Sequence, residues 1–161
     1  MKHFFIVNPT SGDGKSYKQL IDKIHNVCRE KKVSYEVRIT EYAGHAKWLV
    51  KSALSSSTEP IRFYACGGDG TVNETASGLV EMHGGELAVI PVGTGNDFVR
   101  SFSPDGSFLS VEEQLNGEVL KVDAVSAGKS IFVNMLNVGF DSAVVKTVSS
   151  LRNKSSLMRG D

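Results

Sequence analysis

The sequence is poor in the features that mark several large classes of protein. Its 161 residues carry 18 Lys and Arg against 18 Asp and Glu, so the formal net charge is zero and no nucleic-acid partner is expected. No apolar run approaches the length of a membrane span, so any membrane contact would be peripheral. The apolar stretch Phe4–Val7 is too short for a signal peptide and is typical of a strand instead.

Cysteine, histidine and tryptophan are also scarce. Cys28 falls on a predicted helix face and Cys66 ends a predicted strand, which favours buried thiols over a disulfide and fits a cytoplasmic location. The 4 histidines have no cysteine or carboxylate at metal-ligand spacing, which argues against a zinc site. The single tryptophan, Trp48, lies off the apolar stripe of its predicted helix, where it would pack half-exposed or contact a lipid surface.

A regular alternation of apolar strands and amphipathic helices fills the first part of the chain. Strands are predicted over 4–7, 34–40, 61–66 and 87–91, and helices over 15–32, 46–55 and 72–82. This order, with connections long enough for right-handed crossovers, predicts an α/β fold with a parallel sheet and helices on both faces. Ligands bind such sheets beyond the carboxyl ends of the strands.

The pattern changes after about residue 103. A turn is predicted at 103–106, and Ser110-x-x-Glu113 predicts a short capped helix. The apolar runs 119–125 and 131–138 flank a glycine-bearing loop, which predicts an antiparallel hairpin. A further helix is expected over 140–151.

These elements divide the chain into two parts. We expect an α/β domain over 1–117 and the beginning of an antiparallel β-rich domain over 118–161. The inward face of the hairpin needs a partner, so we expect either a truncated chain or one completed by a second copy. The exposed hairpin edge favours a homodimer.

The most informative stretch is Gly67-Gly68-Asp69-Gly70-Thr71, between a predicted strand and a predicted helix. Glycines let backbone N–H groups approach an anion, and a helix N-terminus favours negative charge. Thr71-x-x-Glu74 is read as the capping box of that helix. Because Asp69 would repel a phosphate unless a metal ion or a transferring proton lay between them, we infer a phosphate-handling site with Asp69 at its chemical centre.

A second glycine-rich loop, Asn8–Gly14, follows the first strand. It ends in Gly14-Lys15-Ser16 as a Walker A motif does, but Pro9 stands where that motif needs its first glycine. Proline has no N–H and a fixed φ, so a true P-loop is not expected. The loop is either an ordinary connection or holds phosphate through Thr10, Ser11 and its amides, with Lys15 as a point charge.

The third loop, Pro91–Phe98, follows the fourth strand. Gly93-x-Gly95 lacks the third glycine of the dinucleotide fingerprint, since Phe98 stands there. Asn96 and Asp97 either cap a helix or contact a nucleotide or an acceptor hydroxyl. Because all these loops follow parallel strands, they are expected to converge on one edge of the sheet.

Taken together, these loops resemble the diacylglycerol kinase catalytic family, which includes bacterial lipid kinases and sphingosine and ceramide kinases. The resemblance covers nearly all of residues 4–141. It rests on Asn8-Pro9-Thr10-Ser11-Gly12, Thr40 with Gly44-His45-Ala46, Gly67-Gly68-Asp69-Gly70-Thr71, Gly93-Thr94-Gly95-Asn96-Asp97-Phe98 and Val122-Asp123. The GGDGT block is shared with NAD kinases, but Gly95-Asn96-Asp97-Phe98 lacks the Asn-Glu pair expected of those enzymes.

The resemblance implies a fold like the N-terminal domain of NAD kinases and diacylglycerol kinases. It implies transfer of the γ-phosphoryl of ATP to a lipid hydroxyl with Mg²⁺, the lipid being diacylglycerol or sphingoid-like. With the loop chemistry above, the expected nucleotide-binding residues are Asn8, Pro9, Thr10, Ser11, Gly12, Lys15, Thr40, Gly67, Gly68, Asp69, Gly70, Thr71, Val72, Asn73, Glu74, Gly93, Thr94 and Asn96. Asp69 and Asp123 match metal-linked positions, and Asp69 and Asp97 are the catalytic candidates. The alternative is a non-catalytic ATP-binding or dimerising fragment of such a kinase.

Overall fold

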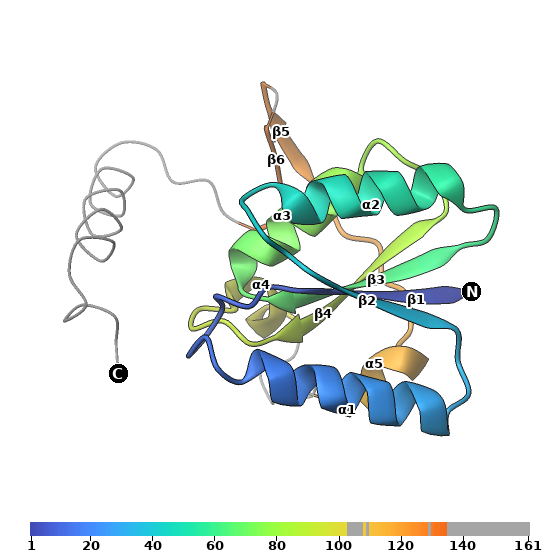
Figure 1. Ribbon diagram of the computed structural model, residues 1–161. Coiled ribbons are helices and arrows are strands. Elements are labelled where there is room, and N and C mark those ends of the chain that lie inside the picture. The colour runs from blue at the N-terminus through green and yellow to red at the C-terminus, as the bar shows by residue number, and fades with distance from the viewer. Residues whose placement is uncertain (103–107, 109, 129, 135–161) are drawn as a thin grey trace.

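The structure is a computed structural model that describes residues 1–102, 108, 110–128 and 130–134 (Figure 1). The turn expected at 103–106, the helix expected at 140–151 and the end of the hairpin's second run lie outside the described residues. Of the helices in the described part of the chain, none is both long and apolar enough to cross a membrane.

A parallel, 4-stranded sheet forms the centre of the molecule. Its strands are β1 (Lys2–Val7), β2 (Tyr35–Ile39), β3 (Ile61–Gly67) and β4 (Gly85–Pro91), in the spatial order β2-β1-β3-β4. The chain leaves β1 toward β2 and then crosses back over β1 to β3. The connections after β1 and β3 therefore run in opposite directions, which makes the carboxyl ends of these neighbouring strands a topological switch point.

Helices cover both faces of this sheet (Figure 1). α1 (Tyr17–Glu30) and α5 (Val111–Asn116) lie on one face, and α2 (His45–Ser56) and α3 (Asp69–Leu79) lie on the other. Alternate residues of one strand serve the two faces: Phe5 packs with the α1 side and Phe4 with the α2 side. Burial on both faces explains the apolar runs of the central strands β1 and β3, whereas the edge strand β2 alternates apolar and polar residues and has no buried residue. The predicted α/β fold class is confirmed.

The remaining described elements are short. α4 (Asp97–Arg100) follows β4, and Ser110 caps α5 as predicted, its hydroxyl accepting from the N–H of Glu113 at 3.3 Å. β5 (Val125–Ala127) and β6 (Ser130–Phe132) pair in the expected antiparallel hairpin. β5 is shorter than predicted, because 119–124 forms neither helix nor strand, and β6 ends at Phe132, before the bend at 133–134. The hairpin lies beside α3, where the Ser77 hydroxyl donates to the carbonyl of Ile131. A domain boundary at 118 stays a prediction.

Candidate functional site

The glycine-rich loops pack directly against one another at the carboxyl edge of the sheet. Gly12 has a φ of +65°, and a Cβ there would overlap the carbonyl oxygen of Val92. A Cβ on Gly93 would lie 2.5 Å from the Cα of Gly68. Since no side chain fits between these backbones, the glycines are needed to assemble the loops.

Asn8 joins the first loop to the start of α3 across the switch point. Its Nδ2 donates to the hydroxyl oxygen of Thr71 at 3.0 Å. Its Oδ1 accepts from the N–H of Thr10 at 3.0 Å and from the Thr10 hydroxyl at 2.9 Å. Asn8 therefore shapes the loop with its side chain, and it places Thr10 and Thr71 on either side of the switch point.

Asp69 holds the third loop in place. Its Oδ2 accepts from the N–H of Asp97 at 3.2 Å, and its Oδ1 accepts from the N–H of Phe98 at 3.0 Å. These N–H groups belong to the first turn of α4, so the carboxylate acts as a cap supplied from another element. Asn96 occupies the N-cap position of this helix with a φ of +55°, but its side chain makes no capping hydrogen bond and instead hydrogen-bonds both backbone polar groups of Gly93.

Glu74 does not form the predicted capping box with Thr71. α3 begins at Asp69, earlier than predicted, and has no side-chain cap. Glu74 Oε1 instead accepts from the N–H of Gly44 at 2.8 Å, and Oε2 accepts from the N–H of Ala46 at 3.3 Å. Glu74 thus caps α2 and fixes the loop that precedes it.

A cavity of about 400 Å³ lies at the switch point, open to solvent on one side. This volume falls within the range of small-molecule binding sites. The loops after β1 and β2 and the first turns of α3 form its walls. The lining residues are Asn8, Pro9, Thr10, Thr40, Glu41, Tyr42, Ala43, Gly70, Thr71 and Glu74. Most of them were predicted, whereas Glu41, Tyr42 and Ala43 were missed because their loop carries no glycine-rich motif.

Several predicted residues lie around the cavity without lining it. The Val72 side chain is buried in the core, where it packs with Ala65 and Phe98. A Cβ on Gly67 would overlap the Thr71 side chain, so Gly67 serves close packing. The other predicted nucleotide-binding residues outside the lining are Ser11, Gly12, Lys15, Gly68, Asp69, Asn73, Gly93, Thr94 and Asn96.

Lys15 stands exposed at a turn that Asp13 organises. The Asp13 carboxylate accepts from the Ser16 hydroxyl at 2.6 Å and from the N–H groups of Lys15 and Ser16 at 2.8 and 2.9 Å. The hydroxyl of Ser16, followed by these N–H groups, lowers the pKa of Asp13 to about 2. Asp13 therefore fixes the entry to α1, and the spacing Asp13-x-x-Ser16 is a local signal that could have revealed it.

The charged side chains that line the cavity are acidic. Glu41 and Glu74 line it, and no Lys or Arg does so among the described lining residues. The described residues contain no group of three or more His, Cys, Asp or Glu side chains that could hold a metal ion. Mg²⁺ commonly uses one or two carboxylates together with water and substrate phosphates, so the carboxylates at this edge fit it.

The other predicted carboxylates differ in their surroundings. Asp97 is exposed, and its Oδ1 lies 3.4 Å from an Arg100 guanidinium nitrogen. Asp123 is also exposed, in the extended segment between α5 and β5. The structure therefore brings Asp69 together with the backbone of Asp97, while no described contact joins either of them to Asp123.

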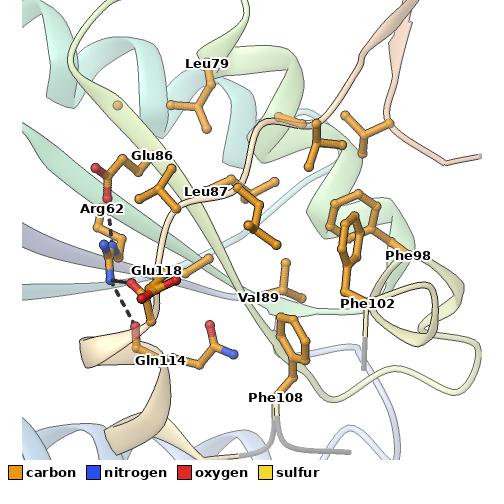
Figure 2. A pocket seen from close by; sticks show the side chains of 18 of the residues that line it. Arg62, Leu79, Glu86, Leu87, Val89, Phe98, Phe102, Phe108, Gln114 and Glu118 are labelled. Atoms are coloured by element: carbon orange, nitrogen blue, oxygen red, sulfur yellow. Dashed lines mark hydrogen bonds and ion pairs between the residues drawn. The ribbon is translucent and has the colours of Figure 1, made fainter. Parts of the chain in front are cut away.

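A second, mostly apolar cavity of about 370 Å³ lies along β4 (Figure 2). Leu87, Val89 and Phe98 line it, and Phe98 also donates its N–H to Asp69. At its polar end, Arg62 donates to Glu86 at 2.8 Å and to the carbonyls of Gln114, Leu115 and Gly117 at 3.1 to 3.3 Å. Arg62 thus caps the C-terminus of α5 and secures it to the sheet.

The fold and the arrangement of the loops define an α/β protein with a cavity at its switch point. The chain belongs to the diacylglycerol kinase catalytic domain family, whose model matches residues 2–127. A probable lipid kinase YegS-like protein of Citrobacter koseri is 31% identical over 139 residues, which are 83% of this chain and 46% of that protein. A probable lipid kinase YegS of Salmonella typhimurium is 28% identical over 96% of this chain and 53% of its own length.

Solved structures agree with this assignment. A diacylglycerol kinase from Bacillus anthracis superimposes with a TM-score of 0.67 and 28% identity, over 81% of this chain and 49% of that one. The chain spans about half the length of the curated relatives it matches.

Proposed function

We propose that this chain supplies the ATP-binding part of an ATP-dependent lipid kinase. The observation that carries the proposal is the cavity at the switch point, formed by the family's own loops in a chain that belongs to the family. Its size suits a nucleotide, and the first turn of α3, with Gly70 and Thr71 in its wall, favours bound anions.

The chain's residues would act mainly by positioning. Thr10 on one side, and Gly70 and Thr71 on the other, would hold the phosphates through hydroxyl and backbone N–H groups, with Ser11 as a further donor beside the lining. When bound, Mg²⁺ would neutralise the negative charge of the phosphates, which the acidic side chains of the cavity wall cannot do. Asp69 would contribute to holding it, since each carboxylate oxygen keeps a lone pair beyond the one used by α4.

Further roles follow from the resemblance. Asp123 would add a second metal-linked carboxylate, and Asp69 or Asp97 would receive the proton of the attacking hydroxyl. The acceptor would be a lipid hydroxyl, of diacylglycerol or a sphingoid-like lipid, met by a cytoplasmic protein in peripheral contact with a membrane. We also propose that residues 118–161 begin a second, β-rich domain and that a second copy of the chain pairs with it.

Calorimetric titration with Mg·ATP, followed by incubation with radiolabelled ATP and short-chain diacylglycerol or sphingosine, tests this proposal. Binding together with a labelled lipid is the expected result. Binding without a labelled lipid would favour the alternative of an ATP-binding fragment without transferase activity. No binding of ATP would overturn the proposal.

A matched pair of variants localises the binding. Thr71→Val removes the hydroxyl that accepts from Asn8 in the cavity wall, and we expect it to weaken ATP binding roughly fivefold, as loss of about 1 kcal/mol implies. Thr58→Val makes the same change at an exposed position before β3, at the opposite edge of the sheet. Equal weakening by both variants would place the nucleotide elsewhere.

A further inference from the structure

Tyr42 is an aromatic side chain in the wall of the proposed nucleotide cavity. Its ring stacks on the ring of His45, with centroids 4.5 Å apart and an interplanar angle of 8°. His45 in turn contacts Trp48, with centroids 5.7 Å apart. Tyr42 nevertheless remains 58% exposed, so the part of its ring that His45 leaves uncovered is open to a ligand.

The support beneath Tyr42 is fixed before any ligand binds. His45 is buried, and its Nδ1 accepts from the N–H of Glu41 at 3.1 Å. The N–H of His45 donates to the carbonyl of Tyr42 at 3.2 Å, and Glu74 secures the N–H of Gly44 between them. The loop backbone and the Tyr42 ring are therefore held in position by His45 and Glu74, which lowers the entropic cost of binding a ligand against the ring.

The walls of the cavity differ in chemistry. Gly70 and Thr71 offer the start of a helix, which suits phosphate, whereas Tyr42 and Ala43 offer an aromatic and an apolar surface. A nucleotide has the same two parts, an anionic chain and a flat base. A base of any identity can stack on an aromatic ring, because every base has a π face.

We propose that Tyr42 is the base-stacking residue of this site, with His45 as its positioning residue. The inference rests on the proposed nucleotide function and adds to it a residue that neither the sequence motifs nor the comparisons assign. It predicts that Tyr42 contributes to binding of the base and contributes nothing to binding of the phosphates.

The test compares Mg·ATP with Mg·tripolyphosphate, which lacks the base and ribose, by calorimetric titration of the full chain. We expect Tyr42→Ala to weaken ATP binding by between about fivefold and 150-fold and to leave tripolyphosphate binding unchanged. Tyr42→Phe keeps the ring and should bind ATP as the unaltered chain does. Phe102→Ala removes another exposed aromatic ring, outside this cavity, and serves as the matched control.

Each other outcome has a distinct meaning. ATP affinity unchanged in Tyr42→Ala would overturn the stacking role and leave the nucleotide site standing. Equal weakening of ATP and tripolyphosphate would also overturn it, because Tyr42 would then act on the shape of the loop. If the unaltered chain bound neither ligand, the proposed function itself would fall and this inference with it.

Discussion

Substitutions of Asp69 distinguish its structural role in holding the loops from its proposed role in catalysis. Its carboxylate accepts from the N–H groups of Asp97 and Phe98 at 3.2 and 3.0 Å. Loss of a helix cap costs roughly 0.5–2 kcal/mol, and hydrogen bonds to a charged group lie toward the upper part of that range. Asp69→Ala should therefore lower the free energy of unfolding by about 2 kcal/mol.

Asp69→Asn is the more informative variant. Its amide oxygen can still accept from one N–H, while the charge and the second acceptor are lost, so we expect a loss of about 1 kcal/mol. For a chain of this size, 1 kcal/mol corresponds to roughly 2–4 °C in Tm. Because the loss is small, Asp69→Asn should stay folded, and a loss of phosphoryl transfer far larger than its stability change would belong to chemistry at the carboxylate.

Urea denaturation and thermal melting, each repeated with saturating Mg·ATP, measure these changes. Asp97→Asn is the control, because its carboxylate is exposed and pairs only at 3.4 Å with Arg100, and it should change stability by less than about 0.5 kcal/mol. An Asp69→Ala variant with an unchanged unfolding midpoint would refute the capping role. Unaltered phosphoryl transfer in Asp69→Asn would remove the carboxylate from the mechanism.

Two further substitutions test contacts that hold the site and the edge of the sheet. Glu74→Ala leaves the first N–H groups of α2 without their acceptor and should lower the unfolding free energy by about 1–2 kcal/mol in urea denaturation. An unchanged unfolding midpoint would contradict the capping role of Glu74. Arg62→Lys should cost about 2 kcal/mol, because one ammonium cannot reach both Glu86 and the carbonyls that end α5. Arg38→Lys, at an exposed ion pair, should lower the unfolding free energy by less than about 0.5 kcal/mol in the same assay. Equal losses in Arg62→Lys and Arg38→Lys would contradict the role of Arg62 in securing α5 to the sheet.

The sequence was sufficient for the order of elements and for the edge at which they would build a site. Strands buried on both faces appear as short apolar runs such as 61–66, and helices show their own period, so each element could be recognised locally. Parallel connection then forces the loops after β1, β2 and β3 to the same edge. Predicting where the cavity would lie needed only the local sequence patterns and the direction of each strand.

The polar contacts that assemble the site could not be predicted in this way. Thr71-x-x-Glu74 matches a capping box, yet Glu74 caps α2, whose N–H groups lie 28 and 30 positions earlier in the chain. Asp69 likewise caps α4 from 28 and 29 positions away. A side chain is satisfied by the donor nearest in space, and only the packed fold places that donor.

Tyr42 shows a different limit of prediction from the sequence. Its loop has no glycine-rich motif, and an isolated tyrosine between Glu41 and Ala43 is consistent with any exposed turn. Only the stacking on His45 and the position in the cavity wall make it a candidate for the proposed base-stacking residue. Aromatic platforms of this kind depend on ring orientation, which a single sequence does not encode in any spacing.

The position of Asp69 among anion-binding glycines has a physical explanation in this arrangement. A carboxylate beside bound phosphates would raise their energy if its charge were uncompensated. Here it faces the N-terminal N–H groups of α4, whose partial positive charge stabilises it, so the carboxylate can stand beside the proposed phosphate site before a cation arrives. Capping and the proposed catalytic role therefore do not compete for Asp69, because the N–H groups that it caps stabilise a charged side chain beside the proposed site.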